Sequence, residues 1–330
     1  MNIIITGGAG FIGSHLTKRL LSEGHTVIVV DNLLTGALEN LEGHLHNPAL
    51  TYVNQDVSIM SVEEAPAGFE HIDQIFHLAS PASPNHHSKF SYHALPMETM
   101  MVNTVGTLNL LKLAEKYNAK FLFASTSEVY GDPEVNPQPE TYFGNVSTTG
   151  PRSVYDEAKR FGETITAYFI RDRQVDGRIV RIFNTYGPHL SPADMRMIVN
   201  FIQQALRGEP ITVYGDGTQT RSLCYVDDTV EGIVRLMNYE HTTGEVVNIG
   251  SSQEFTVLEF AHMVKQLTNS PSPIEHTEHL PQDDPHKRRA ETSKAQKLLG
   301  WSAQTNLESG LRHTIEYVRS VIMSSRPTNN

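Results

Sequence analysis

The sequence contains a single cysteine, Cys224, among its 330 residues. One thiol cannot form an intrachain disulfide, so nothing in the sequence indicates an oxidising compartment. The sequence also lacks any apolar run close to the roughly 20 residues that cross a bilayer. Its first residues, MNIIITGGAG, lack the basic region of a signal peptide. We therefore expect a cytoplasmic protein that has no membrane as a partner.

An excess of positive charge is absent as well. The sequence has 26 Lys and Arg residues against 37 Asp and Glu residues, a formal net charge of −11. This balance argues against duplex nucleic acid or an anionic membrane as the main partner. The sequence has 16 histidines, and their short groups at 44–46, 86–87 and 276–279 lack a compact metal-binding spacing such as HExxH. We expect no bound metal.

The first half of the sequence alternates between two hydrophobic patterns. Short apolar runs predict strands, and apolar residues at helical spacing predict helices between them. This alternation predicts an α/β fold with a Rossmann-type doubly wound parallel sheet, in which ligands bind beyond the carboxyl ends of the strands. The predicted strands are 2–6, 26–31, 50–57, 74–80, 120–125 and 177–183, and the predicted helices begin near residue 11 and cover 97–117 and about 153–173.

The second half of the sequence is less regular and predicts a smaller domain interleaved with the first. We expect residues 1–183 to form the Rossmann domain, with a return to it around 226–250, and 184–225 with 251–322 to form the second domain. Helices are predicted at 226–238, 256–267 and 307–321, and residues 323–330 should be a frayed tail. The connection at 131–152 is rich in proline and glycine, which favours a lid.

A glycine-rich loop follows the first predicted strand. The segment TGGAGFIG places Gly7, Gly10 and Gly13 between a strand and a helix, where main-chain N–H groups and the helix N-terminus can bind a pyrophosphate. Asp31 ends the next strand, where its carboxylate can accept hydrogen bonds from a ribose and repel a 2′-phosphate. These residues predict NAD rather than NADP. Asp56 either meets the adenine edge or is a solvated strand-end residue.

Two further segments carry groups for acid–base chemistry. SVYDEAKR places Tyr155 and Lys159 on one face of a helix, where the ammonium would lower the pKa of the phenol. Such a tyrosine can take a proton from an alcohol during hydride transfer, with Thr126 holding that alcohol. Glu128, in STSEVYG, follows an apolar strand, and a carboxylate there costs free energy unless it is used or paired. Glu128 is therefore either functional or part of an ion pair with a nearby Lys or Arg.

These motifs resemble the extended short-chain dehydrogenase/reductase family, and within it the UDP-glucuronate decarboxylases, which form UDP-xylose. The resemblance extends nearly from end to end of the chain. The segments RIFNTYGP and VYGDGTQTRSLCYV belong to the wider nucleotide-sugar branch, and the more specific segments are HLASPASP at 77–84, ASTSEVYGDPEV at 124–135, YDEAKR at 155–160 and QDDPHKRR at 282–289.

The resemblance implies NAD-dependent oxidation of the glucuronate at C4, loss of CO2, protonation at C5 and reduction at C4. It implies that the second domain binds the nucleotide sugar and that the protein is a homodimer formed through the helices near 97–117 and 153–173. The implied catalytic residues are Thr126, Ser127, Glu128, Tyr155, Lys159 and Arg288. The implied cofactor contacts are Gly7, Gly10, Phe11, Ile12, Gly13, Asp31, Asn32, Thr35, Gly36, Asp56, Val57, Leu78, Ala79, Ser80, Tyr155 and Lys159. The implied substrate contacts are Asn184, Val199, Phe201, Tyr214, Gln219, Arg221 and Arg288, with Arg221 at the diphosphate and Tyr214 and the backbone of 199–201 near the uracil.

Other functions remain open on the sequence alone. Nucleotide-sugar 4-epimerases share the fold, the NAD and the Tyr-Lys pair, although Glu128 and the segment around Arg288 argue against them. Dehydratases of the same branch usually carry an Asp-Glu pair where this chain has Ser127-Glu128. A non-catalytic NAD-binding regulator would not need the complete set of Thr126, Glu128, Tyr155 and Lys159.

Overall fold

A seven-stranded parallel sheet forms the centre of the protein. The computed structural model describes residues 1–61, 66, 69–277 and 287–324. The strand order is β11-β6-β5-β4-β1-β2-β3, so the chain proceeds in one direction from β1 and in the other from β4. The predicted doubly wound α/β fold is confirmed, with its switch point between β1 and β4. The strands are β1 (Asn2–Thr6), β2 (Thr26–Val30), β3 (Leu50–Val53), β4 (Gln74–His77), β5 (Lys120–Thr126), β6 (Gly177–Ile182) and β11 (Val246–Ile249).

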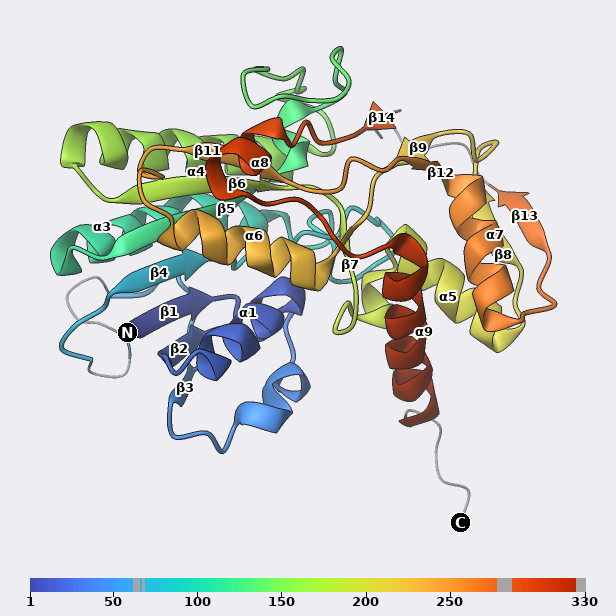
Figure 1. Ribbon diagram of the computed structural model, residues 1–330, viewed down its shortest axis with the longest axis horizontal. Helices are drawn as coiled ribbons and strands as arrows, with labels where there is room; N and C mark the ends of the chain where they lie inside the picture. Colours follow the sequence, from blue (N-terminus) through green and yellow to red (C-terminus); the bar gives the residue numbers. More distant parts are fainter. Residues whose placement is uncertain (62–65, 67–68, 278–286, 325–330) are drawn as a thin grey trace.

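Helices cover both faces of this sheet (Figure 1). Helices α1 (Phe11–Ser22) and α6 (Val226–Asn238) cover one face, and α3 (Thr107–Tyr117) and α4 (Ser153–Arg173) cover the other. Successive residues of β1 alternate between the two cores: Ile3 and Ile5 pack on one side and Ile4 on the other. The predicted helix at 97–117 forms as α2 (Pro96–Met101), a π-helical turn η3 (Val102–Gly106) and α3.

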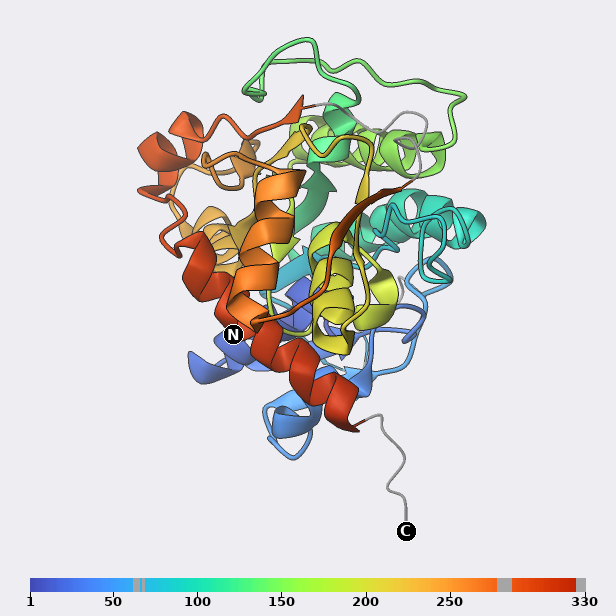
Figure 2. The ribbon, with the colours of Figure 1, turned by 90° about the vertical axis from the view of Figure 1, so that its right-hand side faces the viewer.

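The remaining helices pack beside one end of the sheet, as Figure 2 shows from the side. They include α5 (Met197–Arg207), α7 (Val257–Thr268) and α9 (Leu307–Ser324), with the parallel strand pair β8 (Ile211–Tyr214) and β13 (Ile274–Thr277). A three-stranded sheet joins β12 (Phe255–Thr256), β9 (Thr220–Arg221) and β14 (Lys287–Arg288). Smaller elements are η1 (Leu38–His44), η4 (Ser127–Tyr130), β7 (Thr185–Tyr186), η5 (Pro192–Asp194), β10 (Cys224–Tyr225) and α8 (Ser293–Leu299).

The structure confirms some of the predicted boundaries and shifts others. The return near 226–250 is confirmed, since β11 pairs in parallel with β6. The predicted strands at 50–57 and 74–80 end earlier, at Val53 and His77, because the pairing with the neighbouring strands stops at these residues. Of the predicted tail, Met323 and Ser324 belong to α9 and 325–330 lie outside the described residues, as do 282–286 of the QDDPHKRR segment. The division into two domains stays a prediction.

Candidate active site

A cavity of about 920 Å³ lies at the carboxyl ends of the central strands. Every residue predicted to contact the cofactor lines it, together with Thr126, Ser127, Glu128 and Asn184. The structure therefore brings together the glycine loop, the Tyr-Lys pair and the carboxylate of Glu128. The other predicted substrate residues do not belong to the lining; they are Val199, Phe201, Tyr214, Gln219, Arg221 and Arg288.

The glycine loop is shaped by close approaches of the main chain. Gly7 has φ of +72°, and a Cβ atom there would lie 2.7 Å from the main-chain nitrogen of Ala79, beyond the end of β4. A Cβ atom on Gly13 would overlap the carbonyl oxygen of Gly7. Glycine at these positions lets β1, β4 and the first turn of α1 meet at the switch point. The N-terminus of α1 then faces the cavity through Phe11 and Ile12, an arrangement that fits a pyrophosphate.

Asp31 lies at the end of β2 with 8% of its surface exposed. Its Oδ2 accepts a hydrogen bond from the main-chain nitrogen of Ala9 (3.0 Å), and its Oδ1 accepts one from Leu33 (2.9 Å). Burial raises the pKa of this carboxyl, and the two N–H groups oppose the rise. Each oxygen keeps a lone pair that can accept a hydroxyl proton, so the geometry fits a ribose. Asp56 also lines the cavity, while its Oδ1 accepts from the Ser58 nitrogen (2.8 Å) within its own turn.

Helix α4 places Tyr155 and Lys159 beside the end of β5. The Lys159 Nζ donates to the carbonyl oxygen of Ala124 (2.7 Å) and lies 5.8 Å from the centroid of the Tyr155 ring. Burial raises the pKa of Tyr155 to about 12, against an opposing hydrogen bond with Thr126. Burial also lowers the pKa of Lys159 to about 7, against the opposing charge of Glu163. The predicted lowering of the Tyr155 pKa is therefore wrong for this structure, because burial of the phenolate outweighs the neighbouring amine.

Glu128 lies between two arginines. Its Oε1 accepts from Nη1 of Arg288 and its Oε2 from Nη2 of Arg152. Burial alone would raise the pKa of Glu128, but the charges of Arg152 and Arg288 hold it at about 2. The group is thus an anion at neutral pH. Of the two interpretations of Glu128 left open by the sequence, the ion pair is present. The carboxylate also lines the cavity, and its catalytic role stays a prediction.

Arg288 is itself almost completely buried, with 2% of its surface exposed. Besides Glu128, its Nη1 lies 3.4 Å from the hydroxyl of Ser127, and its Nη2 donates to the carbonyl oxygen of Gly131 (2.9 Å). It pairs along the backbone with Arg221 through β14 and β9, and the charge of Arg221 adds to the lowering of the Glu128 pKa. Arg221 therefore lies within electrostatic reach of the carboxylate although it does not line the cavity.

Two residues of the site were missed from the sequence. Arg152 is the second partner of Glu128, and Tyr92 stacks on Tyr155 with ring centroids 4.9 Å apart and planes 8° from parallel. Both line the cavity. The position of Arg152 three residues before Tyr155, one helical turn away, was a usable signal. Tyr92 lies in an irregular segment, and its position in the sequence gives no comparable signal.

The remaining residues predicted to contact the substrate differ in how far their side chains are buried. The side chains of Val199 and Phe201 point into the core from α5, with 0% and 2% of their surface exposed. Tyr214 ends β8, and Nε2 of Gln219 donates to its carbonyl oxygen (3.0 Å). Their roles at a nucleotide stay predictions.

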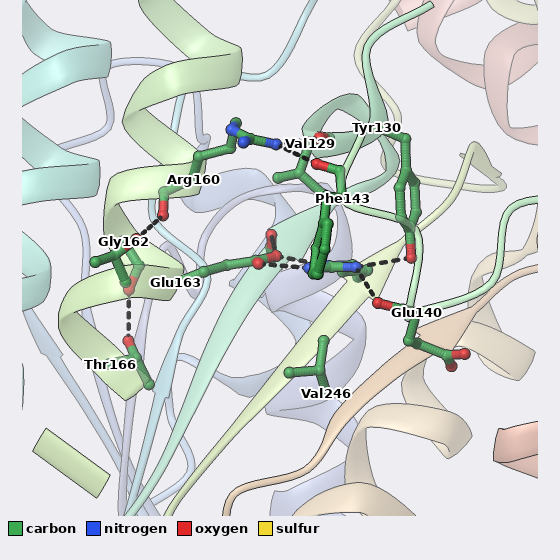
Figure 3. A network of polar contacts seen from close by, with 12 residues as sticks. Val129, Tyr130, Glu140, Phe143, Arg160, Gly162, Glu163, Thr166 and Val246 are labelled. Carbon is green, nitrogen blue, oxygen red and sulfur yellow. Dashed lines mark hydrogen bonds and ion pairs between the residues drawn. The ribbon is translucent and has the colours of Figure 1, made fainter. Parts of the chain in front are cut away.

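The connection 131–152 differs from the predicted lid, since in the described structure only Arg152 of this segment lines the cavity. Figure 3 shows how it is held against α4 and the sheet. Arg160 donates to the carbonyl oxygens of Val129 (2.9 Å) and Phe143 (2.8 Å). Arg181, paired with Glu163 (2.7 Å), donates to the carbonyl oxygen of Glu140 (3.2 Å). Through these hydrogen bonds the segment is held against α4 and β6, beside the residues that line the cavity.

No group of three or more His, Cys, Asp or Glu side chains in the described part of the chain could hold a metal ion. No helix within the same residues is both long and apolar enough to cross a membrane.

Comparison with known proteins agrees with this fold and this arrangement of residues. The chain matches the NAD dependent epimerase/dehydratase family over residues 3–250, and it belongs to that family. It is 50% identical over 311 residues to UDP-glucuronic acid decarboxylase 2 of Arabidopsis thaliana, covering 94% of this chain and 66% of that protein. It is 49% identical over 317 residues to UDP-glucuronic acid decarboxylase 1 of Danio rerio, covering 96% of this chain and 72% of that protein.

A solved structure is similar over nearly the whole chain. UDP-glucuronic acid 4-epimerase from Bacillus cereus, in complex with UDP-glucuronic acid and NAD, has a TM-score of 0.86 and 28% identity, covering 97% of this chain and 100% of that one. The resemblance to the UDP-glucuronate decarboxylases inferred from the sequence is confirmed by the curated relatives. The chain spans slightly less than two thirds of the length of the first of these relatives.

Proposed function

We propose that the protein converts UDP-glucuronate to UDP-xylose and CO2, using an NAD that is regenerated within each cycle. The observation that carries this proposal is the Glu128 carboxylate, held by Arg288 and Arg152 in the same cavity as Tyr155 and the glycine loop. The relatives at 50% and 49% identity bear the name of this activity. A simple 4-epimerase needs no such anion beside the sugar ring.

The residues predicted to contact the cofactor fit NAD. Gly7, Gly10 and Gly13 leave room for a pyrophosphate at the start of α1, and Asp31 offers its carboxylate to the ribose hydroxyls. A 2′-phosphate would meet this buried anion, which favours NAD over NADP. When bound, NAD would serve as the oxidant for C4 of the sugar and, once reduced, as the reductant for the same carbon, so no external reductant would be consumed.

Tyr155 is the proposed base for oxidation at C4. It takes the proton of the C4 hydroxyl, which Thr126 holds, and returns it when C4 is reduced again. In its ammonium form Lys159, 5.8 Å from the ring centroid, favours the phenolate. Burial raises the pKa of Tyr155 to about 12, so positive charge near the ring, from Lys159 in its ammonium form or from a bound cofactor, would favour release of this proton.

Glu128, Ser127 and Arg288 are proposed to act after the oxidation. The product is a β-keto acid, whose carboxyl group leaves as CO2 while its electrons move into the C4 carbonyl. The resulting enolate needs one proton at C5, and Glu128 is proposed to orient the water that delivers it. The anionic Glu128 would also repel the substrate carboxylate, which favours departure of CO2 from the ring.

The nucleotide is assigned to the side of the cavity near α5 and β9. Asn184 lines the cavity, and Arg221 of β9 would supply a cation in an otherwise acidic protein. Val199 and Phe201 are proposed to contribute main-chain rather than side-chain contacts, because their side chains are in the core. Tyr214 and Gln219, which are hydrogen-bonded to each other, would border the uracil.

The direct test is to incubate the purified protein with UDP-glucuronate and NAD and to identify the products. UDP-xylose with an equal amount of CO2 is the expected result. UDP-galacturonate without CO2 would instead show a 4-epimerase. Tight binding of NAD without turnover would indicate a non-catalytic role and would end the proposal.

A further inference from the structure

Gln138 is completely buried, although it lies in the irregular connection between η4 and α4. Its main-chain nitrogen donates to the carbonyl oxygen of Arg289 (2.9 Å), and its own carbonyl accepts from the nitrogen of Glu291 (3.1 Å). Its side chain adds two hydrogen bonds. Oε1 accepts from the main-chain nitrogen of Arg289 (2.9 Å), and Nε2 donates to the carbonyl oxygen of Val135 (2.7 Å). One buried amide therefore joins the connection to the segment 289–291.

That segment directly follows Arg288, the partner of Glu128. The strand β14 that carries Arg288 has only two residues, and β9 pairs with it on one side. Gln138 holds the chain immediately after it. Asn248 of β11 fastens the junction to the main sheet, because its Nδ2 donates to the carbonyl oxygens of Gln138 (3.0 Å) and Glu291 (3.2 Å).

The direction of the Arg288 side chain depends on this anchorage. A buried ion pair repays the cost of desolvation only when its geometry is good, and a displacement of about 1 Å in a site can cost about 100-fold in rate. Arg288 reaches Glu128 from a two-residue strand, so a shift of the main chain at 288–289 moves the guanidinium relative to the carboxylate.

We propose that Gln138 is a positioning residue for Arg288, needed for release of CO2 and not for oxidation at C4. This inference rests on the proposed function. A glutamine suits the position because its amide accepts from one main-chain group and donates to another. Glutamate would keep the acceptor and lose the donor to Val135, and leucine would lose both.

The test compares two partial reactions in single-turnover experiments on the purified full-length chain with UDP-glucuronate. The absorbance of reduced nicotinamide reports oxidation at C4, and trapped CO2 reports decarboxylation. For Gln138→Glu and Gln138→Leu we expect oxidation near the wild-type rate, CO2 release slower by about 10- to 100-fold, and accumulation of reduced nicotinamide. An equal loss of both partial reactions, or no loss of either, would overturn the proposal.

A double-mutant cycle separates positioning from general damage. If Gln138 acts through Arg288, then Gln138→Leu should add little further loss of CO2 release to Arg288→Ala, whereas additive losses would contradict the proposal. Gln74→Leu is the matched control, since Gln74 is equally buried but lies at the opposite end of β4 from the cavity. It should leave the ratio of the two partial rates unchanged.

Amide hydrogen exchange tests the anchoring role directly, even when a variant is poorly active for other reasons. Amide hydrogen exchange at Arg289 and Glu291 should accelerate in Gln138→Leu and stay slow in Gln74→Leu. Unchanged protection at both amides would overturn the anchoring role. Failure of the wild-type protein to release CO2 would instead reject the proposed function, and the two failures are therefore distinguishable.

Discussion

At the scale of single residues, burial and neighbouring charges shift the pKa values of the ionisable groups of the site in opposite directions. Glu128 is kept anionic by Arg152 and Arg288, with a pKa of about 2. Asp156, one residue after the proposed base, has its pKa raised to about 8, mainly by burial and then by the charge of Glu128. Two carboxyl groups in one cluster thus carry different charges at neutral pH, which is how a site can keep one acid and one anion together.

Asp156 provides a prediction about stability and pH. Its pKa is about 8 in the folded protein and near 3.8 when unfolded, so between these values the folded state binds more protons. Its contribution to the free energy of unfolding is therefore complete below about pH 3.8 and is lost as the pH rises towards 8. Asp156→Asn should show a smaller fall in that free energy between about pH 5 and pH 8 than the wild type, as measured by urea unfolding. The exposed Asp172→Asn on the same helix should keep the wild-type slope, and an unchanged slope in Asp156→Asn would disprove this role.

At the scale of elements, the junction of β1 with α1 decides whether the dinucleotide site exists. An alanine inside a helix normally stabilises it by about 1 kcal/mol relative to glycine. Gly13→Ala should have the opposite effect, since the added Cβ overlaps the carbonyl oxygen of Gly7. We expect a loss of about 1–3 kcal/mol in the free energy of unfolding and weaker binding of NAD, measured by calorimetry.

The matched control is Gly43→Ala, because a Cβ atom at Gly43 would have no neighbour within 4 Å. That variant should bind NAD as the wild type does. Wild-type affinity in Gly13→Ala as well would show that the close approach at the switch point is not needed for the cofactor.

The local parts of these elements could be predicted from the sequence, and the long-range parts could not. A strand, a glycine loop and the following carboxylate are neighbours along the chain, so Gly13 and Asp31 were found by spacing. Helix α5 also had a readable amphipathic pattern, in Ile198, Phe201 and Ile202, which was overlooked. The stacking of Tyr92 on Tyr155 and the anchorage by Gln138 depend on how distant segments meet. The raised pKa of Tyr155 depends on burial, which the spacing of Tyr155 and Lys159 does not reveal.

At the scale of the whole molecule, one apolar surface is exposed over neighbouring helices. Met97 and Met101 on α2 and Phe161 and Tyr168 on α4 have between 38% and 59% of their surface exposed. Exposed apolar side chains that gather on packed helices favour an interface, and we propose a homodimer through this face, as expected from the resemblance.

The dimer is tested by Phe161→Asp with light scattering after size-exclusion chromatography. The wild type should elute as a dimer and the variant as a monomer at the same concentration, because a buried aspartate would lose its solvation at the interface. Tyr239→Asp, an exposed aromatic at the end of α6, should remain dimeric. A monomeric wild type, or a dimeric Phe161→Asp, would exclude this face.

The most direct measurement follows the hydrogen atoms of the sugar through one complete turnover. UDP-glucuronate carrying deuterium at C4 is converted in ordinary water, and the product is examined by NMR. We predict UDP-xylose that retains deuterium at C4, since the same carbon is oxidised and reduced within one site, and a parallel reaction in heavy water should place one deuterium at C5. A product that still has its carboxyl group, or UDP-xylose without the C4 label, would contradict decarboxylation through transient oxidation at C4.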